Sequence, residues 1–388
     1  MTFNYVSLFS GIGGFEQALN KLGGTCVMAS EIDKYANQAY EVLYGHKTVG
    51  DVTKVEAADV PDHDLLVGGF PCQAFSVAGK RLGFDDTRGT LFFEIARIAK
   101  VKRPKTLLLE NVKGLVSHDK GRTLDVIVQT LIDIGYTVDF EVLNSKYFGV
   151  PQNRERIFIV AIRDDLVARE PYEIGSRKDV VARAKKRIGA LARVKTFNFD
   201  YPEQTEVTTR LRDILESDVD ERYYLSEEKT AKLVAQLNDE VSLNEVRPVL
   251  TPDRLEKRQN GRRFKENDEE SFTLTAQDRH GVVLSVKSIG NTNPSGNGMN
   301  GQVFDIDAGL APTLTTNKGE GVKVTEAPRY RIRKLTPLEC FRLQGFPDEA
   351  HQALVDAGIS NSQRYKMAGN AVTVNVIDAI ARRLLPLL

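Results

Sequence analysis

Residues 65–79 read LLVGGFPCQAFSVAG and join a strand-like apolar run to a cysteine that follows it closely. An apolar run of strand length, Leu65-Leu66-Val67, ends at two glycines and is followed at once by Pro71 and Cys72. Open α/β sheets place reactive groups on the loops that leave the carboxyl ends of their strands. Cys72 therefore has two interpretations: a nucleophile at a strand end, or a small buried apolar side chain, as most free cysteines are.

The residues before this stretch predict a ligand-binding turn. Residues 5–9 predict a buried strand, residues 10–14 (SGIGG) a glycine turn, and residues 15–19 the start of a helix. Glycines at such a place let a ligand come close to the backbone. The turn is not the dinucleotide-binding fingerprint, because Glu16 stands where the third glycine would be needed.

Two acidic residues follow at further predicted strand ends. Glu31 comes after a strand over residues 25–29, and an acid about 20 residues after the first glycine is typical of ribose binding. Asp51 stands at the expected end of a third unit, within Gly50-Asp51-Val52. Exposed acids usually face only water, but three successive strand ends with Gly, Glu and Asp favour a nucleoside-bearing cofactor.

Strands and helices alternate as far as residue 162. Glu110 follows one predicted strand, and Arg154 and Arg156 precede another, where residues two apart share one face of an extended chain. The alternation predicts an α/β fold with a doubly wound, mostly parallel sheet. The expected helices cover residues 88–100 and 123–134, and the expected strands cover residues 106–109, 136–143 and 157–162.

The pattern changes after residue 163 and predicts a second, smaller, mostly β domain. Residues 273–276 (TLTA) and 313–316 (TLTT) are each followed by Gly-Val at the same spacing, which predicts two similar strand-loop-strand units. Between them, residues 291–301 (NTNPSGNGMNG) predict either a flexible connector, which the composition favours, or a loop that enters a narrow groove. Basic residues at 329–334 either contact phosphates or face water.

The end of the chain predicts helices again. Thr336 and Pro337 are typical of an N-cap and a first helical residue, and residues 374–385 predict the last helix after a turn at Gly369-Asn370. Cys26 and Cys340 are expected in the core.

The composition limits the class of protein. The chain has 388 residues, 41% hydrophobic and 27% charged, with a formal net charge of zero. This balance argues against a protein that coats polyanions such as nucleic acid nonspecifically, but it leaves room for a basic cleft. Three cysteines without C-x-x-C spacing and five histidines without a ligand pattern predict neither disulfides nor a metal site. With no apolar run of about 20 residues and no leader pattern, we expect a cytoplasmic protein that does not bind membranes.

These segments together closely resemble the bacterial-type cytosine-C5 DNA methyltransferases over nearly the whole chain and in the family's order. The chain departs from the family pattern at Ser7, where an acid is common, and at Ile32, where an aromatic residue is frequent. The matching stretches are SLFSGIGGF (7–15), Glu31, GDV (50–52), GGFPCQAFS (68–76), ENV (110–112), FGVPQNRERIFIV (148–160), RKLTPLECFRLQGFP (333–347) and AGNAV (368–372).

The resemblance implies an S-adenosylmethionine-dependent methyltransferase fold that acts on double-stranded DNA. It implies methyl transfer from S-adenosylmethionine to C5 of a flipped-out cytosine in a specific short sequence, through a covalent Cys72–C6 adduct. Residues 1–195, completed by 349–388, would form the catalytic and cofactor-binding domain, and residues 196–348, with the 333–347 motif, the target-recognition domain. A restriction-modification system, with a cognate restriction endonuclease as candidate partner, and a monomeric enzyme are expected.

The resemblance also implies roles for individual residues. It assigns no residue as the base that removes the C5 proton. The expected catalytic residues are Cys72 as nucleophile, Glu110 at the N3 edge of the base, Arg156 at its O2 atom, and Arg154 in support. The expected cofactor-binding residues are Phe9, Gly11, Gly13, Gly14, Glu31, Ile32, Asp51, Val52, Pro71 and Asn370. The expected DNA-binding residues are Gln73, Ser76, Arg88, Asn297, Gly298, Met299, Asn300, Thr315, Thr316, Asn317 and Lys318.

Three alternatives stay open from the sequence. A transfer-RNA cytosine methyltransferase would share the core, but the long variable region argues for duplex DNA. An inactive DNA-binding relative is disfavoured by the intact PCQ, ENV and RER motifs. A nicotinamide oxidoreductase fits the glycine turn but leaves Pro71-Cys72 and Glu110 without a role.

Overall fold

The computed structural model describes residues 2–71, 91–191, 193–236, 245–256, 261–291 and 323–388. The chain divides into two compact units. Unit 1 comprises residues 1–209, 273–277 and 337–388, and unit 2 comprises residues 210–272 and 278–336, so the chain passes between them four times. The boundaries expected at 195/196 and 348/349 both lie inside unit 1 in this division.

The residues around those expected boundaries pack on unit 1. The backbone N–H of Phe199 donates to Asp139 at 2.9 Å, and Thr196 bridges to Val138. At the other boundary, helix α7 (Pro337–Arg342) packs on α8 (Asp348–Asp356) and α9 (Asn361–Asn370). These contacts link segments far apart in the chain, which local composition does not reveal.

Unit 1 is built on a six-stranded sheet with the order β2-β1-β3-β4-β6-β5. The neighbours β2-β1, β1-β3 and β3-β4 are parallel, whereas β6 is antiparallel to both β4 and β5. The sheet is therefore mixed and mostly parallel, as predicted. The strands are β1 (Phe3–Leu8), β2 (Gly24–Ser30), β3 (Leu65–Gly69), β4 (Thr106–Val112), β5 (Tyr136–Asn144) and β6 (Glu155–Arg163).

The reversal of β6 follows from the short connection that precedes it. Residues 145–154 link β5 to β6 and contain no α-helix. A parallel return requires a crossover of a dozen or more residues, usually helical, whereas antiparallel neighbours need only a short turn. The strand that carries Arg156 therefore runs opposite to β4, and Arg156 lies level with Val112.

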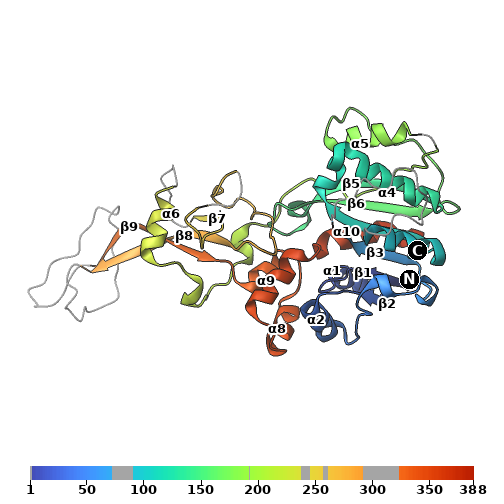
Figure 1. Cartoon of the computed structure of the whole chain (residues 1–388). Helices are drawn as coiled ribbons and strands as arrows, with labels where there is room; N and C mark the ends of the chain where they lie inside the picture. Colours follow the sequence, from blue (N-terminus) through green and yellow to red (C-terminus); the bar gives the residue numbers. More distant parts are fainter. Residues whose placement is uncertain (1, 72–90, 192, 237–244, 257–260, 292–322) are drawn as a thin grey trace, which may run out of the picture. The chain divides into compact units, whose positions relative to one another are not determined.

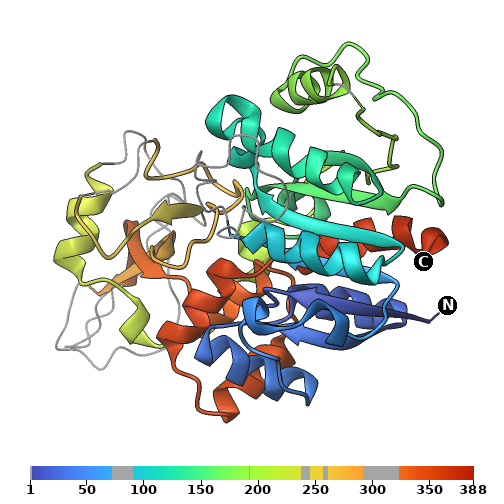
Figure 2. The same cartoon turned by 45° about the vertical axis from the view of Figure 1, so that its right-hand side comes forward.

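Both faces of the sheet are buried. Leu65, Leu66 and Val67 alternate between the two faces, and all three are completely buried, as expected for a covered parallel strand. Figure 2 shows α3 and α4 lying side by side over the sheet, and their apolar side chains join one core with β1, β3 and β4. The helices of unit 1 not yet given are α1 (Gly14–Leu19), α2 (Lys34–Tyr44), α3 (Leu91–Lys102), α4 (Arg122–Asp133), α5 (Val180–Gly189) and α10 (Val374–Leu384).

Unit 2 contains a three-stranded antiparallel sheet with the order β7-β8-β9. Its elements are α6 (Glu227–Val234), β7 (Val246–Leu250), β8 (His280–Asn291) and β9 (Lys323–Lys334) (Figure 1). Leu233, Val249, Val283 and Ile332 form its small core. The expectation of a smaller, mostly β unit agrees with this architecture.

Three local predictions were wrong. Residues 273–276 form no strand and belong to unit 1, so they are not half of a repeated β unit; residues 313–322 lie outside the described part. Asp51 follows no strand but starts the 3-10 turn Val52–Lys54. Gly369-Asn370 is not a turn, because helix α9 continues to Asn370. Among the described residues, no helix is long and apolar enough to cross a bilayer.

Candidate active site

Phe9, Glu31 and Glu110, among the predicted site residues that the structure describes, lie at or just after the carboxyl ends of β1, β2 and β4, and Arg156, near the start of antiparallel β6, lies level with the end of β4. In the sheet β1 lies between β2 and β3, so the strand order reverses there. Open α/β sheets bind ligands at such a switch point. The chain leaves β1 through left-handed backbone at Phe9, Gly11 and Gly13, with φ values of 57°, 56° and 78°. Helix α1 then begins at Gly14.

The glycine turn is tightly packed at Gly13 and Gly14 and open at Gly11. A Cβ atom on Gly13 would lie 2.3 Å from the Tyr44 ring, and one on Gly14 would lie 2.6 Å from Cγ2 of Val372. A Cβ atom on Gly11 would meet no atom of the described residues within 4 Å. The turn thus presents bare backbone at Gly11 and rests on side chains at its next two glycines.

Gly13→Ala should destabilise the protein more than Gly45→Ala. Both glycines have left-handed backbone, with φ of 78° and 74°, where an L residue costs about 1–2 kcal/mol. A Cβ on Gly13 would overlap the Tyr44 ring, whereas no atom of the described residues lies within 4 Å of a Cβ on Gly45. Overpacking adds about 1–3 kcal/mol. Urea denaturation of both variants measures the difference, and equal losses of unfolding free energy would contradict this account.

Glu31 ties the end of β2 to the glycine turn. Its Oε2 accepts a hydrogen bond from the backbone N–H of Gly11 at 2.9 Å. Its Oε1 accepts from the N–H groups of Ile32 and Asp33 at 2.8 and 2.7 Å. Ile32, next to this carboxylate, is 75% exposed. Glu31 therefore fixes the turn and stands next to an open apolar surface.

Asp51 reaches the same edge through a loop. The Ser30 hydroxyl donates to the Gly50 carbonyl at 2.7 Å, which holds the loop at the end of β2. Oδ1 of Asp51 accepts hydrogen bonds from the Thr53 hydroxyl and N–H group, and these lower the pKa of Asp51. Val52 next to it is buried. Asp51 is a half-buried residue at this edge, although not at a strand end.

The ends of β3 and β4 lie beside each other. Gly69 pairs with Glu110 in the parallel register, and a Cβ on Gly69 would come within 3.2 Å of Oε2 of Glu110. The amide nitrogen of Asn111 donates to the Phe70 carbonyl at 2.8 Å. Asn111 thus holds the backbone that leads into Pro71, the last described residue before Cys72. Cys72 itself lies outside the described residues.

Glu110 and Arg156 form a buried ion pair at this edge. Nε of Arg156 lies 3.0 Å from Oε1 of Glu110, and their side chains are only 16% and 10% exposed. Removing one member of a buried pair leaves an uncompensated charge. The arrangement holds a carboxylate and a guanidinium together at the end of β4, beside the strand that leads to Cys72.

Arg154 faces away from this pair, into the interior of unit 1. Its Nη1 donates to the Leu274 carbonyl at 3.0 Å, and its Nη2 donates to the carbonyls of Ala371 and Gly369 at 2.9 and 3.3 Å. Burial, with the nearby charge of Arg156, lowers the pKa of Arg154 to about 9. The geometry makes Arg154 a positioning residue rather than a catalytic residue, because it binds backbone from two distant segments.

Three residues that the sequence interpretation passed over also build the site. Asn111 holds the Phe70 carbonyl. The Gln152 side chain donates to the Leu343 carbonyl and accepts from the Leu274 N–H. Val372 lies against both Gly14 and Gly69. All three stand inside matched motifs, but an amide or a valine suggests no chemistry of its own, so only the motif membership could have indicated them.

Of the remaining predicted residues, the structure describes Asn370 but none of the expected DNA-binding residues. Asn370 is exposed at the last residue of α9. All eleven expected DNA-binding residues lie outside the described part of the chain: Gln73, Ser76, Arg88, Asn297, Gly298, Met299, Asn300, Thr315, Thr316, Asn317 and Lys318.

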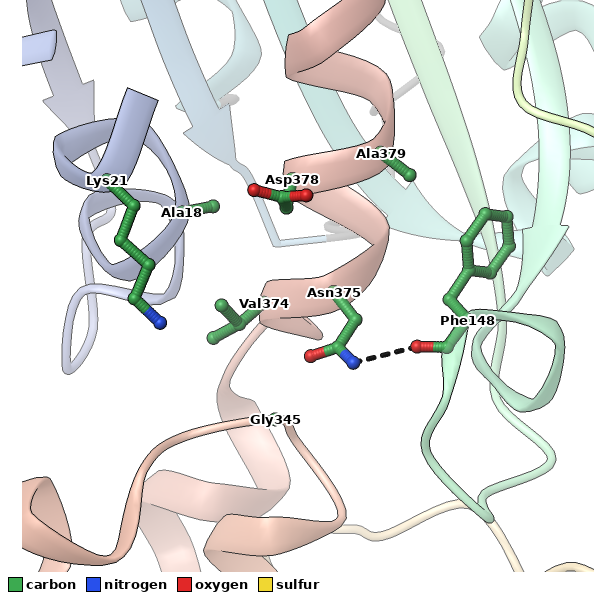
Figure 3. Close-up of a pocket in the computed structure, with 8 residues that line it drawn as sticks. All are labelled: Ala18, Lys21, Phe148, Gly345, Val374, Asn375, Asp378 and Ala379. Carbon is green, nitrogen blue, oxygen red and sulfur yellow. Dashed lines mark hydrogen bonds between the residues drawn. The ribbon is translucent and has the colours of Figure 1, made fainter. Parts of the chain in front are cut away.

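A separate cavity of about 390 Å³ lies between α1 and α10. Figure 3 shows Lys21 and Asp378 at its wall, and Asn375, whose amide donates to the Phe148 carbonyl at 2.8 Å. None of the predicted catalytic or cofactor-binding residues lines it. This cavity is therefore not the predicted site.

Comparison with known proteins identifies the family. The family model of the C-5 cytosine-specific DNA methylases matches residues 3–385. The orphan methyltransferase M.SPRI of Bacillus phage SPR is 39% identical, over 98% of this chain and 97% of the relative. The type II methyltransferase M.HhaI of Haemophilus parahaemolyticus is 34% identical, over 97% and 92%. The Dnmt2 methyltransferase of S. pombe has the same fold, with a TM-score of 0.60 at 20% identity, over 99% of both chains. The chain therefore belongs to the C-5 cytosine-specific DNA methylases and is a DNA cytosine-C5 methyltransferase.

Proposed function

We propose that the protein transfers the methyl group of S-adenosylmethionine to C5 of a flipped-out cytosine in a specific short sequence of double-stranded DNA. The observation that carries this proposal is the buried Glu110–Arg156 pair at the end of β4. It adjoins the strand end that leads to Cys72, and the glycine turn and Glu31 follow the neighbouring strands.

The residues at the ends of β1 and β2 fit S-adenosylmethionine. Gly11 leaves open space in front of the turn. A carboxylate has about four acceptor positions, and Glu31 uses three for backbone N–H groups, so one remains for a ribose hydroxyl. Exposed Ile32 offers an apolar surface for the adenine ring. When bound, the cofactor supplies an electrophilic methyl group on a sulfonium sulfur.

The catalytic residues would act on the cytosine ring. The Cys72 thiolate forms a bond to C6, and the ring electrons move toward C5 and N3, which makes C5 nucleophilic. Glu110 hydrogen-bonds the N3 edge, where this charge develops, and Arg156 meets O2 while holding Glu110 in place. After C5 has gained the methyl group, loss of its proton restores the double bond and expels Cys72.

The target base must leave the helix for this chemistry. In duplex DNA the stack hides C5 and C6, so a methyltransferase extrudes the base into its pocket. Unit 2, together with the DNA-reading residues predicted from the sequence, would supply the contacts that select the sequence. We infer this division of labour from the family, with catalysis in unit 1 and recognition in unit 2.

A direct assay tests the proposal. The protein is incubated with radiolabelled S-adenosylmethionine and either genomic duplex DNA or transfer RNA, and methylated positions are mapped at single-base resolution. We expect label only in DNA, on C5 of cytosines within one short sequence. Label in transfer RNA would favour the RNA alternative, and no label in either would favour an inactive relative.

The names of the relatives are relevant to the expected partner, a cognate restriction endonuclease. M.SPRI and M.SPBetaI are named orphan methyltransferases, from Bacillus phages SPR and SPbeta, whereas M.HhaI is a type II enzyme. The phage relatives support an enzyme that works without the cognate restriction endonuclease expected as a candidate partner. Digestion of unmethylated target DNA by an extract of the source cells would instead support a restriction-modification system.

Glu110→Gln should lower the turnover number about 10²–10⁴-fold, the usual contribution of a general acid or base. Glutamine keeps the shape of the side chain but loses the charge that pairs with Arg156 and the proton exchange at N3. The matched control is Glu141→Gln, which removes a carboxylate that pairs with Arg177 at 2.7 Å elsewhere in unit 1. Steady-state kinetics on target DNA compare the two, and similar turnover numbers would remove Glu110 from its role.

A further inference from the structure

Glu16 is a buried carboxyl group with no cationic partner in the described structure. It lies on α1, two residues beyond the glycine turn, and is completely buried. Its Oε1 accepts a hydrogen bond from the Tyr40 hydroxyl at 3.1 Å. The Ser7 hydroxyl on β1 faces the carboxyl and acts to lower its pKa, but not at good hydrogen-bond geometry, and among the described residues Oε2 has no other hydrogen-bond partner. Among the described residues, Glu16 takes part in no ion pair, although charges are almost never fully buried unpaired.

The titratable groups that face Glu16 do not neutralise its charge. They are Tyr5 on β1, Cys26 on β2, and Tyr40 and Tyr44 on α2. Burial, together with Glu16 itself, raises the pKa of each of them, so they stay protonated and uncharged near neutral pH. The basic residue in this chain of contacts, His46, packs edge-on against the Tyr40 ring, at 5.3 Å. Burial raises the pKa of Glu16 to about 7.

The same cluster supports the glycine turn. The Tyr44 hydroxyl lies 2.6 Å from the Gly13 carbonyl and donates to it. The rings of Tyr44 and Tyr40 pack together, with centroids 4.6 Å apart, and Tyr40 hydrogen-bonds Glu16. Contacts therefore run without interruption from Glu16 to the backbone of the turn that we assign to the cofactor.

We propose that Glu16 is a specificity-determining residue, whose buried and uncompensated negative charge makes the site favour the cationic methyl donor over the neutral-sulfur product. This inference rests on the proposed function, since it requires S-adenosylmethionine at the glycine turn. S-adenosylmethionine carries a sulfonium charge, which methyl transfer removes to leave the thioether of S-adenosylhomocysteine. Because water is excluded around Glu16, its attraction for the sulfonium is weakly screened. The charge thereby assists release of the product.

The charge predicts a proton release that only the cationic ligand causes. A bound cation stabilises the ionised carboxylate and so lowers the pKa of Glu16. At pH 7 a group with a pKa of about 7 is half protonated, so binding should release up to roughly half a proton. The affinity for S-adenosylmethionine should therefore rise with pH through 7, whereas the affinity for S-adenosylhomocysteine should change little.

Isothermal titration calorimetry of the full chain at pH 7, in two buffers of different ionisation enthalpy, counts the released protons. We expect release with S-adenosylmethionine and little with S-adenosylhomocysteine. In Glu16→Gln the release should vanish, and the preference for the donor over the product should fall on the order of tenfold. Glu41→Gln, on the exposed side of α2, is the matched control and should bind as the wild type does.

The outcomes separate the two proposals. If the wild type binds neither ligand, the proposed function fails. If it binds both with equal proton release, or if Glu16→Gln keeps the difference, the inference about Glu16 is wrong. Tyr40→Phe offers a second variant, because it removes the one well-formed hydrogen bond to Glu16 and should move the pH of maximal proton release upward.

Stability without any ligand gives an independent check. The pKa of Glu16 is about 7 in the folded protein, against an ordinary value of 4.5 for a glutamate side chain in water. The bound proton therefore stabilises the folded state fully below pH 4.5, and this contribution to the free energy of unfolding is lost as the pH rises through 7. Glu16→Gln should be more stable relative to the wild type at pH 8 than at pH 5, as measured by urea denaturation. An unchanged difference would show that Glu16 does not titrate in this range.

Discussion

Cys72→Ala should abolish methyl transfer and leave the binding of S-adenosylmethionine within about twofold of the wild type. Alanine removes the only atom that can bond to C6, and the loss of a covalent nucleophile costs on the order of 10⁴-fold or more in turnover. The cofactor contacts that we propose come from the ends of β1 and β2, which Cys72 does not join. Rate measurements with labelled cofactor and equilibrium binding test the two halves of this expectation.

The covalent step can be tested separately. Target DNA with 5-fluorocytosine at the methylated position cannot lose a proton from C5, so the Cys72–C6 bond should persist after methyl transfer. A denaturing gel should show a protein–DNA adduct with the wild type and none with Cys72→Ala. The control is Cys340→Ala, which removes a buried thiol from α7 and should still form the adduct. Turnover by Cys72→Ala would remove Cys72 from its role.

Arg154→Met should lower the free energy of unfolding by several kcal/mol, at about 1–3 kcal/mol for each buried carbonyl left without its donor. Methionine fills much of the space but donates no hydrogen bond, so the carbonyls of Leu274, Gly369 and Ala371 lose their donors. An unsatisfied buried polar group costs about 1–3 kcal/mol. The effect should be large although Arg154 does not face Glu110.

A matched control separates burial from charge. Arg177→Met removes an arginine whose side chain is 44% exposed and paired with Glu141, and an exposed ion pair contributes up to about 1 kcal/mol. Urea denaturation followed by far-ultraviolet circular dichroism measures both variants, which suits a chain with no tryptophan. Equal losses would show that Arg154 does not hold the three carbonyls in solution.

Much of the fold could be predicted because its determinants are local. Apolar runs of strand length at residues 65–67 and 106–109 form the first parts of β3 and β4, and these strands continue through Gly69 and through Glu110 to Val112. Parallel strands expose their carboxyl ends along one edge, so the residues after them meet there. The contact of Glu110 with Gly69 follows from this rule.

The predictions that failed depend on contacts between distant parts of the chain. Residues 273–276 look like a strand by composition, yet Gln152 and Arg154 bind their backbone as part of unit 1. Arg154 and Arg156 look equivalent by spacing, yet only Arg156 reaches Glu110. Nothing in a local pattern tells which neighbour a side chain will meet across 120 or 215 residues.

The sequence by itself determined that the sheet is mostly parallel and which residues follow each strand along the chain. These features depend on strand periodicity and glycine turns, which act over a few residues. The tertiary structure alone decided which of these residues touch. It reversed β6 and so paired Arg156 with Glu110, and it turned Arg154 inward. It also buried Glu16 next to the glycine turn, where no cation of the described residues pairs with it. Those outcomes depend on packing between segments that are remote in the chain, and such packing is set by the whole fold.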